Sequence, residues 1–194
     1  LHDALPIYKS SVLVGDYLFA RAFQLMVEPG SIRVLDILSN ASATIAEGEV
    51  LQLTAAQDLA TTEATYLKVV RGKTAALFSA ATESGAVIAG APEAWVAALR
   101  DYGDALGIAF QIVDDVLDYG GSTRDIGKNI GDDFRERKLT LPVIKAVAKA
   151  GAPERSFWTR VIEKGDQQDG DLEEALRLLH QHGVLEETRA EARA

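Results

Sequence analysis

A run of acidic residues with helical spacing constrains the fold of this chain more than any other feature. Residues 111–118 read QIVDDVLD, so one amide and three carboxylates stand at positions i, i+3, i+4 and i+7. On an α-helix, side chains with this spacing share a single stripe. Apolar residues fill most of the remaining circumference, which predicts a helix that is buried on nearly all sides. The four residues of the stripe are Gln111, Asp114, Asp115 and Asp118.

The charge around this stripe predicts a divalent cation. Residues 101–123 contain five acids and no lysine or arginine, so no neighbouring side chain neutralises carboxylates that repel one another. Mg²⁺ is commonly held by one or two carboxylates, several waters and the oxygens of a substrate phosphate. The alternative is a solvated acidic face, but such faces are generally broader and mix both signs of charge. We therefore expect the stripe to bind Mg²⁺.

Lysines elsewhere in the sequence can provide the anion-binding groups that such a site requires. Glycines after residue 119 end the acidic helix and let the chain return, so that Lys128 and Lys138 can reach anionic oxygens. Residues 62–84 predict a second helix whose apolar stripe also contains Lys73 and Thr74. A lysine on an apolar stripe requires either an anionic partner or a route to solvent. The sequence of this helix is equally consistent with an anion-binding lysine and with one that extends to solvent.

Several other classes of protein are excluded by motifs and composition. Neither Gly72-Lys73 nor Gly127-Lys128 completes a P-loop, and no GxGxxG segment follows a predicted strand. The formal net charge of −9 argues against nucleic acid as a partner. No apolar run approaches the roughly 18 residues that a membrane span needs. The absence of cysteine fits a reducing cytoplasm.

Helical periodicity throughout the chain predicts an all-α fold without strands. On the second expected helix, Glu49 and Gln52 lie one turn apart and are predicted to face the aspartate stripe. The expected helices cover residues 12–27, 31–53, 62–84, 92–118, 141–149, 153–164, 172–181 and 185 onward.

Five blocks of sequence resemble the all-trans polyprenyl diphosphate synthases, a family of class I isoprenoid prenyltransferases. The blocks are GDYLFARAF at 15–23, GKTAALF at 72–78, FQIVDDVLDY at 110–119, GKNIGDD at 127–133 and KLTLP at 138–142. The segments AEGEVLQ at 46–52 and ERKLTLP at 136–142 are most similar to the bacterial long-chain, octaprenyl-type members. The resemblance implies a class I isoprenoid synthase bundle, in which antiparallel helices surround a central cavity, here incomplete.

The resemblance also implies roles for individual residues. Asp114, supported by Asp118, corresponds to the second aspartate-rich motif, which holds Mg²⁺ against the allylic diphosphate, and Asp115 belongs to the same catalytic motif. Two of the lysines, Lys73 and Lys128, are expected to assist catalysis as well as to bind substrate. The positions that contact the diphosphate or border its pocket are Lys73, Thr74, Gln111, Lys128 and Lys138.

The reaction implied is a condensation of isopentenyl diphosphate with an allylic diphosphate. Metal ions and lysines stabilise the departing diphosphate, and the double bond of isopentenyl diphosphate then attacks the allylic cation. No nucleophilic side chain is required. The resemblance further implies a homodimer in the cytoplasm that supplies quinone side chains, as in ubiquinone biosynthesis.

Two alternatives belong to other functional classes. A non-catalytic accessory subunit could bind a diphosphate or a full-length synthase, although such a protein has no need to keep Asp114, Lys73 and Lys128 together. A terpene cyclase is less consistent with the GKT and KLTLP blocks. Genomic DNA upstream would decide, since an in-frame aspartate-rich motif followed by two arginines would reject the accessory subunit.

The ends of the sequence carry their own expectations. Residues 1–7, LHDALPI, match the in-frame translation of a sequencing adapter, so they are not expected to belong to the native domain. Residues 8–194 are expected to form one domain that is truncated at both ends. The family's first aspartate-rich motif and its isopentenyl diphosphate site have no counterpart here, so we expect this chain alone to form no prenyl product.

Overall fold

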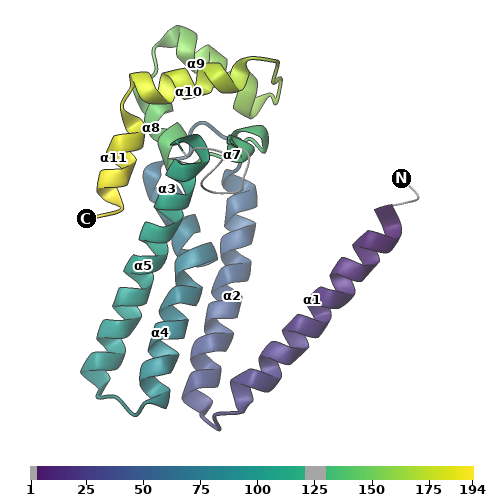
Figure 1. Cartoon of the computed structure of the whole chain (residues 1–194), viewed down its shortest axis with the longest axis vertical. Helices are drawn as coiled ribbons and strands as arrows, with labels where there is room; N and C mark the ends of the chain where they lie inside the picture. Colours follow the sequence, from purple (N-terminus) through teal and green to yellow (C-terminus); the bar gives the residue numbers. More distant parts are fainter. Residues whose placement is uncertain (1–3, 121–129) are drawn as a thin grey trace.

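The structure is a computed structural model that describes residues 4–120 and 130–194, and every regular element in those ranges is helical (Figure 1). The all-α prediction is therefore confirmed. The elements are α1 (Ala4–Val27), α2 (Ile32–Ala55), α3 (Glu63–Val70), the π-helical turn η1 (Arg71–Ala75), α4 (Ala76–Ile88), α5 (Glu93–Gly120), α7 (Asp132–Arg135), α8 (Leu141–Lys149), α9 (Ala152–Trp158), the π-helical turn η2 (Thr159–Glu163), α10 (Asp171–Gln181) and α11 (Val184–Glu191).

The long helices form an antiparallel bundle, and the short helices α7 to α11 form a cap above it (Figure 1). Helix α2 runs toward the cap, α3, η1 and α4 return as one continuous rod, and α5 runs back to the cap. Ser31 starts α2 as predicted, because its side chain accepts the backbone N–H of Val34 at 3.3 Å. The sequence predicted neither the π-helical turn η1 nor the short helix α7.

Glycines allow the helices of the bundle to approach closely. A Cβ atom added to Gly48 on α2 would lie 2.6 Å from the backbone nitrogen of Lys73 in η1. A Cβ atom on Gly107 of α5 would lie 2.5 Å from the Cα atom of Ala75. Both distances are shorter than van der Waals contact allows. The π-helical turn is therefore held between α2 and α5 by backbone contact.

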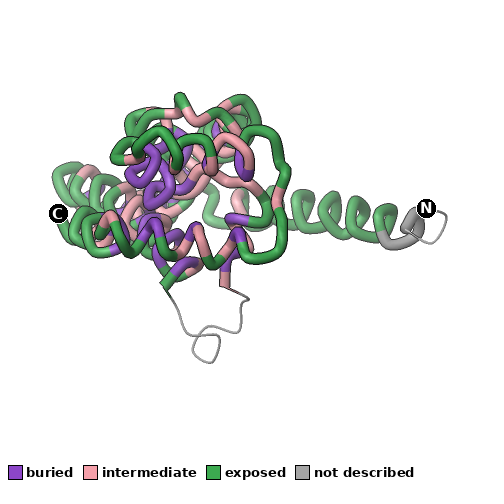
Figure 2. The backbone as a smooth tube through the Cα atoms, turned by 90° about the horizontal axis from the view of Figure 1, so that it is seen from above, coloured by how far each residue is buried: buried purple, intermediate pink, exposed green. Residues whose placement is uncertain are grey.

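The main hydrophobic core lies in the cap and includes residues of α8, α9, α10 and α11; Figure 2, seen from above, shows the buried residues gathered together. It contains Trp158, Val161 and Leu178, each fully buried. No helix in the described ranges has the length and apolar character needed to cross a bilayer.

One buried cation ties the last helix to the rest of the cap. The Lys145 ammonium on α8 lies 3.3 Å from a carboxylate oxygen of Glu63, 3.1 Å from Glu187 and 2.7 Å from Glu191. Burial by itself lowers the pKa of Lys145, but these hydrogen bonds outweigh it and raise the pKa above its ordinary value. Lys145 therefore joins helices α3, α8 and α11 through ion pairs.

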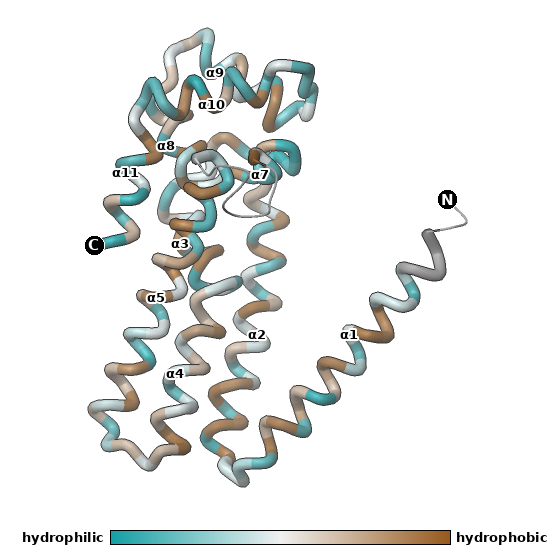
Figure 3. The backbone as a smooth tube through the Cα atoms, in the orientation of Figure 1, coloured by the Kyte–Doolittle hydropathy of each residue, from teal (hydrophilic) through white to brown (hydrophobic). Residues whose placement is uncertain are grey.

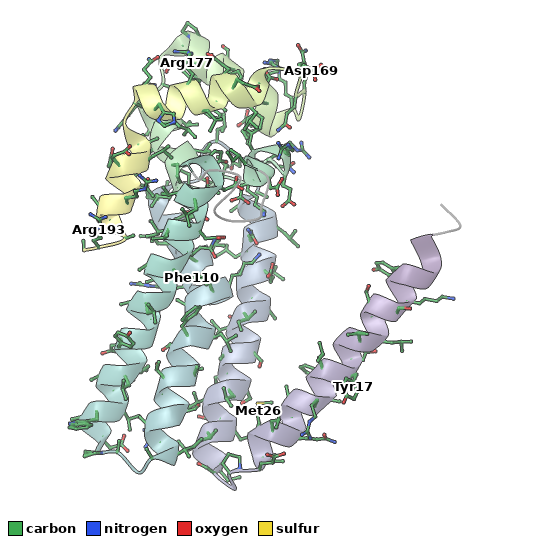
Figure 4. All side chains as sticks on the ribbon, viewed as in Figure 1. Tyr17, Met26, Phe110, Asp169, Arg177 and Arg193 are labelled. Atoms are coloured by element: carbon green, nitrogen blue, oxygen red, sulfur yellow. The ribbon has the colours of Figure 1, made fainter. Side chains whose placement is uncertain are left out.

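The prediction that the aspartate helix is buried on nearly all sides is wrong. Along α5, Trp95 is 67% exposed, Tyr102 57% and Phe110 54%, and hydrophobic residues recur on α1, α4 and α5 (Figures 3 and 4). The opposite side of α5 packs against the cap through Val116. No described element covers these residues of α5, and α1 diverges from the bundle on the side of α2 (Figure 1). Amphipathicity indicated which residues are apolar but not which of them have a packing partner.

The close approach at Gly48 can be tested by substitution. Gly48→Ala should lower the free energy of unfolding by about 1–3 kcal/mol, because the added methyl group overlaps the backbone of η1. Gly85→Ala is the matched control, because a Cβ atom there meets nothing within 4 Å. The control should stabilise the protein by up to about 1 kcal/mol through helix propensity. Chemical denaturation of both variants measures the difference, and equal effects would contradict the packing described.

Candidate functional site

A cavity of about 280 Å³ lies where the long helices meet the cap. Its walls come from α2, from the rod formed by α3 and η1, from α5 and from residues 133–140. A more open groove of about 710 Å³ lies between α2 and α4, and its lining includes none of the predicted site residues. The cavity is lined by Gln52, Ala55, Ala56, Thr61, Tyr66, Val69, Val70, Lys73, Thr74, Gln111, Asp114, Asp115, Asp133, Lys138, Leu139 and Thr140.

Lys73 reaches this cavity from the π-helical turn. Its ammonium donates to the Oε1 atom of Gln52 at 2.7 Å and lies 3.2 Å from a carboxylate oxygen of Glu49. Gln52 lines the cavity as predicted, whereas the Glu49 side chain is half exposed and reaches inward only to pair with Lys73. A π-helical turn shifts the register of the side chains that follow it, and such turns are common at functional sites.

Lys138 enters the cavity from the opposite wall. Its ammonium lies 2.9 Å from a carboxylate oxygen of Asp133 and 2.7 Å from one of Glu136. Burial works against this charge, but the hydrogen bonds to Glu136 and Asp133 raise the pKa of Lys138 above its ordinary value. Both described lysines of the predicted site are therefore paired with acids of the protein itself. Lys128 lies outside the described residues.

Asp115 is the buried centre of the site. Only 3% of the residue is exposed, and its carboxylate accepts the hydroxyl of Tyr66 at 2.7 Å and the side-chain amide of Gln111 at 2.8 Å. Burial raises the pKa of Asp115 to about 6, although hydrogen bonds from Gln111, Tyr66 and the backbone of Leu141 work in the opposite direction. Both carboxylate oxygens are engaged with groups of the protein.

The two other aspartates of the stripe have different surroundings. Asp114 lines the cavity. Asp118 is not part of the lining, and its Oδ2 atom accepts the backbone N–H of Asp133 at 3.1 Å. Burial, followed by the negative charge of Asp133, raises the pKa of Asp118. Of the stripe predicted from the sequence, Asp114 and Asp115 therefore line the cavity, whereas Asp118 contacts the start of α7.

No group of three or more acidic, histidine or cysteine side chains in the described ranges is arranged to hold a metal ion. This arrangement still fits Mg²⁺, which needs only one or two carboxylates when water and phosphate oxygens complete its coordination. Asp114 and Asp115 are the stripe aspartates that line the cavity, and Asp133 lines it as well.

Several lining residues were not assigned a role from the sequence, among them Asp133, Thr140 and Tyr66. Asp133 is the last residue of the GKNIGDD block at 127–133, so the sequence did carry a signal for it. Thr140 precedes α8, and its hydroxyl has no partner among the described residues. Tyr66 gave no local signal, because its partner Asp115 lies 49 residues away.

The bond between Tyr66 and Asp115 predicts a measurable effect on stability. Tyr66→Phe should lower the free energy of unfolding by about 1.5–3 kcal/mol, because a buried carboxylate loses a donor. Tyr102→Phe is the control, since Tyr102 is exposed and should change stability by less than about 0.5 kcal/mol. Urea denaturation at neutral pH compares the two variants. Similar values would show that the Tyr66 hydroxyl contributes nothing.

Comparison with known proteins gives consistent matches. The family model described as polyprenyl synthetase matches residues 7–179. The octaprenyl diphosphate synthase of Escherichia coli K12 is 45% identical over 184 residues, which cover 94% of this chain and 56% of that protein.

Two solved structures match the fold as well. The decaprenyl diphosphate synthase of Rhodobacter capsulatus is 75% identical, with a TM-score of 0.88 over 95% of this chain and 57% of that one. The polyprenyl synthase of Caulobacter crescentus CB15, complexed with calcium and isoprenyl diphosphate, is 53% identical, with a TM-score of 0.91. The match covers 95% of this chain and 56% of that one. The chain thus spans little more than half the length of these proteins.

Proposed function

The chain belongs to the polyprenyl synthetase family and has the class I isoprenoid synthase helical fold, and from that premise we propose that it forms the diphosphate-binding wall of a prenyl-chain-elongating enzyme. The whole enzyme would join isopentenyl diphosphate to an allylic diphosphate. The observation that carries this proposal is the cavity in which Lys73 and Lys138 face Asp114. Such a cavity can hold an anion and its counter-cation together.

We propose that Asp114 holds Mg²⁺, with Asp118 in support through a water molecule. The ion, when bound, would neutralise negative charge that develops on the departing diphosphate. Lys73 and Lys138 would donate hydrogen bonds to diphosphate oxygens that the ion does not contact. Departure of the diphosphate leaves an allylic cation, which the double bond of isopentenyl diphosphate attacks before a proton is lost.

The partners of the two lysines support this assignment. Glu49 and Gln52 hold Lys73, and Asp133 and Glu136 hold Lys138. A diphosphate carries enough negative charge to replace these acids, and it would release them toward metal or solvent. The lysines would then move only by the reach of their own side chains, since both already line the cavity.

Finer features of the function follow the named relatives. We propose a long-chain product that serves quinone side-chain biosynthesis, including that of ubiquinone, and a homodimeric enzyme that acts in the cytoplasm. Lys128 is retained as a diphosphate ligand on the strength of its sequence block alone. A non-catalytic accessory subunit is not favoured, because the named relatives cited above are synthases.

Binding of magnesium pyrophosphate to the chain tests the proposal directly. Isothermal titration calorimetry should show binding that requires Mg²⁺, and Lys73→Gln should weaken it by roughly tenfold or more, because a charged hydrogen bond is lost. Lys68→Gln is the control, since Lys68 lies on the same rod and lines the open groove instead of the cavity. Equal effects of the two substitutions would reject the assignment of Lys73.

A second comparison tests the metal ligand. Asp114→Asn preserves shape but removes the charge that Mg²⁺ needs, so the Mg²⁺ concentration that half-saturates pyrophosphate binding should rise by roughly tenfold or more. Asp101→Asn should leave it unchanged, because Asp101 is exposed and pairs with Arg100 at 3.0 Å. If the acidic stripe were only a solvated face, the two variants would behave alike.

A further inference from the structure

The turn that carries Lys138 is closed by a defined set of backbone hydrogen bonds. At the end of α7, the backbone N–H of Lys138 donates to the carbonyl oxygen of Asp133 at 2.9 Å, and that of Arg137 donates to the carbonyl oxygen of Phe134 at 2.9 Å. Arg137 itself has a left-handed backbone, with a φ of 58°. These features form a Schellman motif, a helix ending in which the chain reverses after a left-handed residue. The reversal returns Lys138 to the cavity, where its ammonium lies 2.9 Å from a carboxylate oxygen of Asp133.

Arginine is an unusual residue at the left-handed position of this motif. Glycine is usual there, and asparagine is the common substitute, because the Cβ atom of other residues crowds the backbone. Among the described residues, only Gln57 shares this left-handed conformation without being glycine. A strained backbone of this kind persists when surrounding contacts hold it. The side chain of Arg137 is therefore expected to make a contact that glycine could not.

The Arg137 side chain lies across Gly165, in the segment that follows η2. A Cβ atom added to Gly165 would overlap the Nη1 atom of Arg137 and lie 3.0 Å from its Cζ atom, so the guanidinium occupies the space beside the glycine. Two residues farther along, the Gln167 side chain donates to the carbonyl oxygen of Phe134 at 2.8 Å and to that of Val161 at 3.2 Å. Residues 165–167 therefore contact both the helical part and the left-handed part of the turn.

The ion pairs of Lys138 cannot fix the turn by themselves. Its partners Asp133 and Glu136 belong to the same turn, so the lysine and both acids would move together. The beginning of the turn is joined to α5, because the backbone N–H of Asp133 donates to the Oδ2 atom of Asp118 at 3.1 Å. The corresponding support at the end of the turn comes from the arginine that precedes Lys138.

We propose that Arg137 is a positioning residue, which fixes residues 133–138 against the segment after η2 and so directs Lys138 into the cavity. Arg137 is not part of the cavity lining, so it acts through Lys138 and not through contact with a substrate. Gln167 assists from the same segment by accepting the position of α7 through its bond to Phe134. The effect on diphosphate binding rests on the proposed function, whereas the position of the turn does not.

Hydrogen exchange of the Lys138 backbone amide tests the contact without any ligand. Gly165→Ala and Gly183→Ala both add a methyl group to a left-handed backbone, with φ values of 67° and 65°, so both should lower stability to a similar extent. A Cβ atom at Gly165 displaces the Arg137 guanidinium, whereas one at Gly183 meets no described atom within 4 Å. In ¹⁵N-labelled protein, the Lys138 amide should exchange at least about tenfold faster in Gly165→Ala than in Gly183→Ala. Equal exchange in the two variants would overturn the proposal.

Substitution of the arginine gives a second, independent comparison. Asparagine tolerates the left-handed conformation, so Arg137→Asn shortens the side chain without requiring the backbone to change. Gln57→Asn is the matched control at the other strained position. Arg137→Asn should speed exchange of the Lys138 amide severalfold, and Gln57→Asn should leave it unchanged. If relief of strain were the main effect, Arg137→Asn would slow this exchange, and that result would also reject the positioning role. Should Gly165→Ala not fold, this pair decides alone.

Titration with magnesium pyrophosphate measures the consequence for binding. When the wild-type chain binds pyrophosphate, Arg137→Asn should weaken the binding severalfold and Gln57→Asn should not. Unchanged binding in Arg137→Asn would mean that Lys138 reaches the cavity without this support, and would overturn the proposal. A wild-type chain that shows the expected exchange pattern but binds no pyrophosphate would reject the proposed function and leave the positioning of the turn intact.

Discussion

The buried carboxylate of Asp115 is the interaction on which the rest of the site depends. A buried charge without partners costs several kcal/mol, so it must be surrounded by donors. The Tyr66 hydroxyl and the Gln111 amide come from two different helices, and the start of α8 supplies a backbone N–H. The requirement to satisfy one anion therefore fixes α3, α5 and α8 at the level of the cavity.

The same electrostatic logic applies to the two lysines that line the cavity. Lys73 and Lys138 are each held by acids of the protein, so neither charge remains uncompensated inside the bundle. An incoming anion would exchange partners with these acids. The π-helical turn and the glycine contact at Gly48 hold the backbone of Lys73 in place while that exchange occurs. Rigid backbone and replaceable side-chain partners are thus combined in one site.

Much of the fold could be predicted from the sequence. Helical periodicity indicated an all-α protein, and Ser31 marked the start of α2 because capping is a local interaction. The grouping of Lys73, Thr74, Gln111, Asp114 and Lys138 around one cavity also agrees with the sequence blocks. By contrast, the burial expected for α5 failed, because periodicity describes the character of a face and not what lies against it.

The sequence by itself determined that three carboxylates and an amide would share one helical stripe, since that follows from 3.6 residues per turn. Only the tertiary structure decided their separate surroundings: Asp114 lines the cavity, Asp115 lines it but is buried, and Asp118 contacts the start of α7. The consecutive residues Asp114 and Asp115 are about 100° apart around the helix axis, so they meet different neighbours. The environment that each side chain meets is set by partners such as Tyr66, 49 residues away from Asp115, and no local pattern encodes so distant a contact.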